Sequence, residues 1–210
     1  MSQNREPFGN RVMYWMLKWG AVEPLFRIYF RGRFHGKDNL VRRGPVLVVS
    51  NHASYFDPPL LSTCMRRPVA YMAKQELFDV PLLGPAIRAY GAYPVSRGTG
   101  DRSAIDATLK RLEKDWAVGI FLQGTRTRDA RISSPKLGAA LIAARAQVPL
   151  LPVSLWGTQH ILGKGLPRPA PVTVRVGQLI LPPESSDREE LTAVTQRCTD
   201  AIHAMHDLGR

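Results

Sequence analysis

Short apolar runs rich in Val, Ile and Leu alternate with amphipathic stretches along most of the chain. Apolar runs of this length are typical of strands buried on both faces of a sheet. We expect six such strands, at 45–50, 69–73, 91–95, 118–122, 150–155 and 172–176. Helices are expected at 102–114, 136–147 and 187–208. Strands that alternate with helices predict an α/β fold, with a mostly parallel central sheet flanked by helices and a functional site at the carboxyl ends of its strands.

The N-terminal segment has a different pattern, in which large apolar residues recur at helical spacing: Val12, Trp15, Met16 and Trp19. Arg11 and Lys18 lie off that face, and Pro24, tolerated in a first helical turn, marks the start of a second helix rich in Phe and Arg. Two short amphipathic helices of this composition suit the bilayer interface, and the alternative is a helical arm packed on its own domain. We therefore divide the chain into an amphipathic membrane-associating arm, 1–34, and an α/β domain, 35–210.

Composition and charge narrow the class of protein. With 210 residues, 44% of them hydrophobic, the chain is long and apolar enough to bury the core of one domain, which excludes a mostly disordered protein. Lys and Arg number 29 against 17 Asp and Glu, a formal net charge of +12. Such a surface attracts nucleic acid, anionic lipid headgroups or an acidic protein, and charge alone does not choose among them.

The cysteines and the hydropathy of the chain indicate in which cellular compartment the protein works. Cys64 and Cys198 lie far apart and form no CxxC pair, which favours two reduced thiols in the cytosol. The N-terminus has neither the apolar stretch nor the cleavage site of a secretory signal. No uncharged apolar run approaches the ~18–20 residues of a spanning helix. We expect a peripheral or monotopic protein that meets a membrane from its cytoplasmic face.

A histidine and an aspartate follow the first predicted strand, in the segment NHASYFD. A neutral imidazole such as that of His52 is the natural general base near pH 7. Asp57 can fix its tautomer and stabilise the imidazolium across a short loop. Asp57 also precedes two prolines, the pattern of a helix start with Asp as N-cap. The two interpretations are compatible, because one carboxylate can cap the helix and hold His52.

Two later strands also end in polar segments. In FLQGTRTRD, Gly124 lets backbone N–H groups approach an anion, Thr125 adds a hydroxyl donor, and Arg126 supplies a planar charged fork. This is a plausible phosphate site, and an ordinary polar turn is the alternative. The strand in GAYPVSR ends at Arg97, a second guanidinium for the same cleft or a surface cation. A strand bracketed by prolines, VPLLPVS, is core or the wall of an acyl-chain groove.

Four motifs, in this order and at these spacings, resemble those of the glycerolipid acyltransferase family: NHxxxxD, GxYPVSR, xGTR and VPLLPV. The resemblance spans 46–157, and the AKQEL stretch at 73–77 fits it too. Four ordered motifs are far more specific than any one of them. The resemblance implies an α/β domain, often preceded by membrane-associating helices, and transfer of a fatty acyl group from a thioester to a lysophospholipid hydroxyl. The expected acceptor is 1-acyl-glycerol-3-phosphate, which would give phosphatidic acid.

The resemblance also implies roles for residues. His52 would take the proton from the acceptor hydroxyl, and Asp57 would orient His52. The phosphate of the acceptor would be bound by Lys74, Arg97, Gly124, Thr125 and Arg126. Residues that position substrate or line the acyl groove would be Asn51, Gln123 and Pro152. No metal or cofactor is expected beyond the donor, acyl-CoA or acyl carrier protein, and the expected partners are an anionic membrane surface and no nucleic acid.

One position departs from the family pattern, which usually has Pro-Glu before Gly-Thr-Arg where this chain has Leu122-Gln123. Glutamine keeps the hydrogen-bonding length but loses the charge, so this position cannot act as an anion. Either Gln123 imitates a positioning residue, which we favour because the other motif residues are intact, or acceptor preference or activity is altered.

Two rival functions stay open. One is an acyltransferase for another lysolipid, such as a lyso-ornithine lipid or another lysophospholipid. The other is a degenerate, non-catalytic basic protein that binds membranes or nucleic acid. Other candidate sites are weaker: 157–164 is one residue too long for a phosphate loop, and no GxSxG is present. His203 and His206 have no evident third metal ligand, which favours a solvated helix face.

Overall fold

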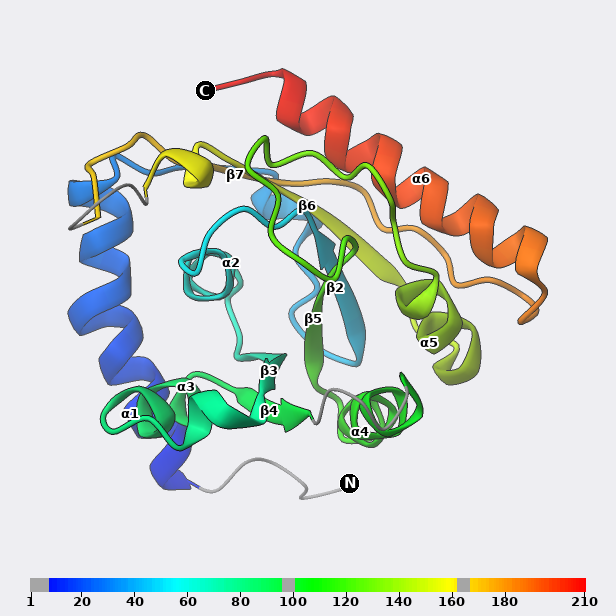
Figure 1. Ribbon diagram of the computed structural model, residues 1–210, viewed down its shortest axis with the longest axis horizontal. Helices are drawn as coiled ribbons and strands as arrows, with labels where there is room; N and C mark the ends of the chain where they lie inside the picture. Colours follow the sequence, from blue (N-terminus) through cyan, green and yellow to red (C-terminus); the bar gives the residue numbers. More distant parts are fainter. Residues whose placement is uncertain (1–7, 96–100, 162–166) are drawn as a thin grey trace.

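The computed structural model describes residues 8–95, 101–161 and 167–210. Within these ranges, seven strands form one sheet in the order β1-β7-β6-β2-β5-β3-β4 (Figure 1). The strands are β1 (Arg33–His35), β2 (Val46–Ser50), β3 (Val69–Lys74), β4 (Ala92–Val95), β5 (Ala117–Phe121), β6 (Leu150–Trp156) and β7 (Thr173–Val176). All neighbours pair in parallel except β6 and β7. The predicted α/β fold with a mostly parallel sheet is confirmed.

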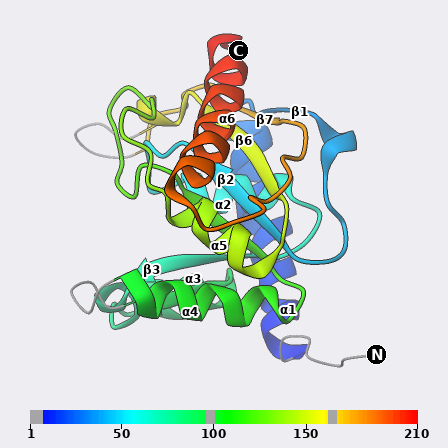
Figure 2. The same cartoon turned by 90° about the vertical axis from the view of Figure 1, so that its right-hand side faces the viewer.

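Helices cover both faces of the sheet (Figures 1 and 2). One face carries α4 (Asp101–Leu112), α5 (Gly138–Ala146) and α6 (Arg188–Asp207), and the other carries α2 (Asp57–Cys64) and the N-terminal arm. A further helix, α3 (Leu83–Ala89), contacts α1 (Phe8–Leu17). The arm continues from α1 into two π-helical turns, Lys18–Val22 and Leu25–Tyr29. Short 3₁₀ turns lie at Lys37–Asn39, Gln75–Phe78 and Thr158–His160.

The six predicted strands and the three predicted helices of the domain are present, with boundaries shifted by a few residues. The central strand β2 is buried at every position, which is why its sequence is an unbroken apolar run. Besides the short 3₁₀ turns, one strand and one α-helix were not predicted. Strand β1 is a three-residue edge strand with exposed ends, and α3 contains Gly84 and Pro85, so neither has a distinctive apolar period.

The arm contacts the domain through one side and leaves an apolar side exposed. Tyr14, Phe26 and Phe30 are buried against the domain, so the packed-arm alternative holds for these residues. The outward side carries Met16 at 69% exposure and Ile28 at 77%. This apolar side faces solvent where a water-soluble helix would carry polar residues. None of the helices in the described part of the chain is both long and apolar enough to span a bilayer.

Candidate active site

Strand β2 delivers a histidine–aspartate pair to the carboxyl edge of the sheet. The chain leaves β2 at Ser50, and α2 begins at Asp57, so His52 lies in the loop between them. Nδ1 of His52 lies 2.7 Å from Oδ2 of Asp57. Since a carboxylate only accepts, Nδ1 carries the hydrogen of this bond and the lone pair is left on Nε2. The pair therefore has the geometry of an oriented general base.

The carboxylate of Asp57 is fixed by more than the histidine. Its Oδ2 also accepts hydrogen bonds from the backbone N–H of Ala53 at 2.6 Å and of Ser54 at 2.7 Å, and the residue is fully buried. The prediction that Asp57 is the N-cap of the next helix is wrong. Phe56 occupies the cap position, and no side chain caps the helix, because the Asp57 carboxylate is turned back to close the loop around His52.

Phe121 supports the imidazole from the neighbouring strand. The rings of His52 and Phe121 are stacked with centroids 4.0 Å apart and planes 14° apart. Phe121 is in turn stacked on Tyr71 of β3, at 6.0 Å. The strand register pairs Phe121 with Ser50, two residues before His52, so the stack is a consequence of sheet pairing. Sequence reasoning missed Phe121 as a site residue, because its place at the end of a predicted strand did not say which strand would pair with β2.

Asn51 ties the start of the loop that carries His52 to the sheet. Its Nδ2 donates to the carbonyls of Leu155 at 2.8 Å and Ala130 at 2.9 Å, and its Oδ1 accepts from the Leu155 N–H at 2.8 Å. The side chain is fully buried. Asn51 therefore holds together β2, β6 and the loop after β5. Its amide nitrogen and its amide oxygen are both engaged in these contacts, so its role is to position the loop.

Gln123 holds the loop after β5 against His52. Its Nε2 donates to Thr127 Oγ1 at 3.2 Å and to the Arg131 carbonyl at 3.1 Å. The backbone N–H of Thr127 in turn donates to the His52 carbonyl at 2.9 Å. Gln123 is buried and uses its amide as a donor, a role that an ionised glutamate in this position could not fill.

Arg126 and Tyr55 connect the two loops on the solvent side. The Arg126 guanidinium lies over the Tyr55 ring, 3.5 Å from its centroid, and Nη2 donates to Tyr55 Oη at 2.8 Å. Gly124, with φ +69°, makes the turn that precedes Arg126, and Thr125 is exposed beside it. Tyr55 was also missed from the sequence. An exposed aromatic residue inside the loop that carries the histidine was the available signal.

The other predicted site residues lie farther from this cluster. Lys74 is exposed at the end of β3, on the same edge as His52 but two strands from β2, or roughly 10 Å at ordinary strand spacing. Pro152 is buried within β6 opposite Val49, inside the sheet and away from that edge. Arg97 lies outside the described residues.

The end of α6 secures the same loop, and the prediction of a solvated histidine face is wrong. Nε2 of His203 accepts a hydrogen bond from the Ile132 N–H at 3.1 Å, and Arg131 forms an ion pair with Asp207. His206 is buried, and burial lowers its pKa, with the positive charge of Arg131 adding to the effect. In the described ranges no three His, Cys, Asp or Glu side chains are grouped as metal ligands would be.

Comparisons with known proteins identify the family of this chain. The Acyltransferase family model matches residues 31–156. The chain is 31% identical over 168 residues to the chloroplastic 1-acyl-sn-glycerol-3-phosphate acyltransferase LPAT1 of Arabidopsis thaliana, covering 76% of this chain and 45% of that protein. It is 30% identical over 158 residues to the 1-acyl-sn-glycerol-3-phosphate acyltransferase of Streptococcus pneumoniae, covering 74% and 58%. The chain thus spans about half the length of these relatives.

A solved structure shares the fold over most of this chain. The crystal structure of the 1-acyl-sn-glycerophosphate (LPA) acyltransferase PlsC from Thermotoga maritima superposes with a TM-score of 0.67 at 25% sequence identity. The superposition covers 90% of this chain and 80% of that one, so it extends well beyond the residues matched by the family model.

Proposed function

This chain belongs to the acyltransferase family, and we propose that it transfers a fatty acyl group from an acyl thioester to the free hydroxyl of a lysophospholipid. The proposed acceptor is 1-acyl-glycerol-3-phosphate and the product phosphatidic acid, because relatives of this chain carry the name of that activity. The single observation that carries the proposal is the contact of His52 with the buried Asp57, at the carboxyl edge of a parallel sheet.

The proposed reaction runs through Nε2 of His52. This nitrogen accepts the proton of the acceptor hydroxyl while the hydroxyl oxygen attacks the thioester carbonyl. The tetrahedral intermediate collapses by breaking the carbon–sulfur bond, and the departing thiolate takes the proton back from His52. The Asp57 carboxylate stabilises the imidazolium between these steps, because it is held in place by three donors. The reaction needs no acyl-enzyme and no metal or cofactor besides the donor, acyl-CoA or acyl carrier protein.

The acceptor phosphate is assigned to Arg126, with Gly124 and Thr125 as neighbouring donors. Arg126 makes no ion pair with a carboxylate among the described residues, and its guanidinium is exposed on top of Tyr55. A stacked guanidinium keeps most of its N–H donors available for a phosphate. Lys74 and Arg97 remain proposed further cations for the same phosphate. Gln123 and Asn51 are proposed as positioning residues, and Pro152 as part of the acyl groove.

The arm is proposed to place the site at an anionic membrane surface on its cytoplasmic face. Support comes from the exposed apolar side of the arm, with Met16 and Ile28, and from the net charge of +12. Replacing either residue by Glu should weaken binding to vesicles that contain anionic lipid. The matched control is Leu181→Glu, at an equally exposed leucine outside the arm. Equal vesicle binding by the arm variants and the control would contradict this placement.

A thioester-release assay with purified protein tests the function. Acyl-CoA and acyl carrier protein thioesters should each be offered with 1-acyl-glycerol-3-phosphate, a phosphate-free lysolipid and a lyso-ornithine lipid. Release should require the phosphate-bearing acceptor and should be abolished by His52→Ala, whereas His160→Ala, at an exposed histidine outside the site, should retain it. Acceptor-independent or undiminished release in the His52 variant would refute the mechanism. Salt-dependent nucleic-acid binding without transfer would favour the non-catalytic alternative.

A further inference from the structure

A cavity of about 400 Å³ lies apart from His52, between the arm and the far end of α2. Helix α2 begins at the His52 edge of the sheet and ends at Cys64, which lines the cavity. Strand β1 runs opposite to β2, so Lys37, just after β1, also lies toward the edge away from His52. The proposed acyl transfer uses none of the residues that line this cavity.

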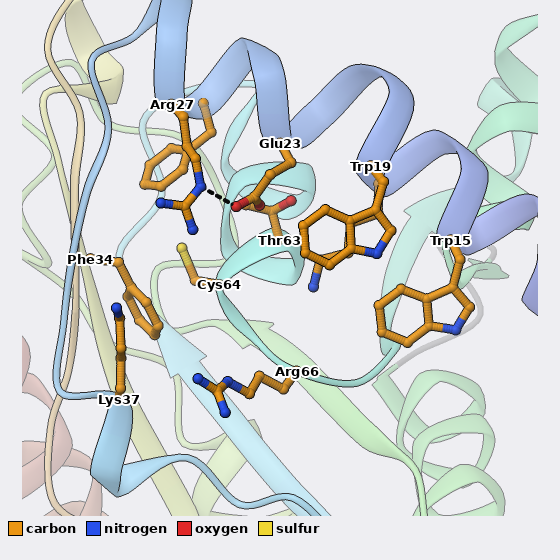
Figure 3. Close-up of a pocket in the computed structure, with 11 residues that line it drawn as sticks. Trp15, Trp19, Glu23, Arg27, Phe34, Lys37, Thr63, Cys64 and Arg66 are labelled. Carbon is orange, nitrogen blue, oxygen red and sulfur yellow. Dashed lines mark hydrogen bonds and ion pairs between the residues drawn. The ribbon is translucent and has the colours of Figure 1, made fainter.

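The lining is strongly cationic. Its charged side chains are Lys18, Arg27, Lys37, Arg66 and the carboxylate Glu23. Arg27 forms an ion pair with Glu23, and the other three cations form no ion pair with any carboxylate that the structure describes. Figure 3 shows Arg27 and Arg66 reaching toward the opening from opposite sides, with Lys37 on a third side and Cys64 between them. Like charges that converge on one hollow favour an anion there.

One of these cations is already held in a costly position. Lys18 is 3% exposed, and its Nζ donates to the Met65 carbonyl at 3.0 Å while lying 5.1 Å from the ring centroid of Trp15 and 5.6 Å from that of Trp19. These neutral partners stabilise the ammonium but bring no negative charge. The Glu23 carboxylate attracts the Lys18 ammonium but is itself paired with Arg27, so an anion in the adjoining cavity would add negative charge where water is largely excluded.

The two other cations are open to a ligand. Neither the Lys37 ammonium nor the Arg66 guanidinium has a hydrogen-bonding or ion-pair partner among the described residues, and both residues are exposed. A guanidinium and an ammonium on one rim can bind a phosphate group from two directions. They therefore provide contacts that the folded chain itself leaves unused.

Apart from Thr63, the rest of the lining is apolar or a thiol, and its apolar part continues onto the exposed side of the arm. Trp19 is 60% exposed at the cavity, and Met16, on the same helical side, is 69% exposed. Free phosphate would use only the cations and would fill little of the cavity. A phospholipid headgroup uses the cations for its phosphate, and its acyl chains can lie over the apolar side of the arm.

We infer that this cavity binds the phosphate-bearing headgroup of an anionic phospholipid, with Lys37 and Arg66 contacting the phosphate and Trp19 beneath the glycerol or acyl chains. The site is separate from the proposed acceptor site and binds lipid that is not consumed. It would fix the rotation of the arm on the bilayer, because a headgroup held at one point of an amphipathic arm sets which side faces the lipid.

Calorimetric titration with a soluble short-chain lipid tests this inference independently of acyl transfer. The probe is dihexanoyl phosphatidylglycerol below its micelle concentration, compared with dihexanoyl phosphatidylcholine and with free glycerol 3-phosphate. The cavity variant is Lys37→Ala with Arg66→Ala. The matched control is Lys110→Ala with Arg197→Ala, which removes the same two charges from exposed positions on α4 and α6, on the other face of the sheet. Arg126→Ala reports any binding at the proposed acceptor site.

Phosphatidylglycerol should bind saturably to the parent protein, and the cavity variant should lose about tenfold in affinity because two charge-assisted contacts are removed. The control variant and Arg126→Ala should bind as the parent does, and phosphatidylcholine should bind much more weakly than phosphatidylglycerol. Unchanged affinity in the cavity variant would overturn the inference. So would equal affinity for phosphatidylcholine, or glycerol 3-phosphate binding as tightly as the lipid. Loss of acyl transfer with intact lipid binding would refute the proposed function and leave this site standing.

Discussion

Arg126 lies on the ring of Tyr55, a residue 71 positions earlier, and donates a hydrogen bond to its hydroxyl at 2.8 Å. The contact fastens the loop that carries the arginine to the loop that carries His52. An arginine side chain that makes no contacts has many rotamers. Stacking on Tyr55 therefore fixes the position and the direction of the remaining N–H donors of Arg126. Tyr55 therefore positions Arg126, the residue that we propose to bind the acceptor phosphate.

Tyr55→Ala should raise the acceptor KM about tenfold, because both the stack and the hydrogen bond that hold Arg126 are lost. Tyr55→Phe keeps the stack and should raise it by a smaller factor. Steady-state kinetics with 1-acyl-glycerol-3-phosphate as the varied substrate measure both effects. In an Arg126→Ala background the two Tyr55 variants should have little further effect, since they act through the arginine. If the effects of the Tyr55 and Arg126 substitutions on the acceptor KM were fully additive, Tyr55 would act independently of Arg126.

Asp57→Asn should lower kcat by at least about a hundredfold with little change in the acceptor KM. The amide oxygen can still accept the Ala53 and Ser54 N–H bonds, so the loop should keep its shape while the charge that stabilises the imidazolium is lost. Single-turnover kinetics and a thermal melt separate chemistry from folding. Asp106→Asn, at an exposed carboxylate on α4, is the control. A variant that turns over near the parent rate would remove Asp57 from the mechanism.

Gln123→Glu should lower the free energy of unfolding by about 1–3 kcal/mol and reduce kcat. An ionised carboxylate cannot donate to Thr127 Oγ1 or to the Arg131 carbonyl, and it would face that carbonyl oxygen as a second acceptor. Urea denaturation measures the loss, with Gln178→Glu as a control at an exposed glutamine. Gln123→Glu with undiminished stability would show that the family's usual glutamate fits here through other contacts.

The stability of the protein should fall as the pH drops below about 6.5. Burial lowers the pKa of His206 from its ordinary value of 6.5, so the unfolded chain binds this proton more readily than the folded one. The stabilisation is fully present above pH 6.5 and is lost as the pH falls toward the lowered folded pKa. Urea midpoints across this range measure the dependence, and His206→Gln should flatten it while His160→Gln should not. An equal acid dependence in both variants would exclude His206 as its source.

The sequence predicted those parts of the fold and site that depend on neighbouring residues. Unbroken apolar runs mark strands buried on both faces, and β2 and β6 are almost wholly buried for that reason. The loop of His52 and Asp57 is equally local, because five positions separate the two side chains and the turn brings them to 2.7 Å. The edge strand β1 escaped prediction, because its pairing with β7 leaves its ends exposed and no apolar period.

The tertiary structure alone decided which distant groups complete the site. Phe121 supports His52 because β5 pairs with β2, and His203 bonds to Ile132 because α6 crosses the loop after β5, contacts that no local pattern encodes. The structure also gave the Asp57 carboxylate one of two roles that the sequence had treated as compatible, because it closes its own loop through Ala53 and Ser54 and does not cap α2. Hydrophobic periodicity determines which face of a segment is buried, whereas hydrogen bonds and ring contacts depend on how separate segments cross in space.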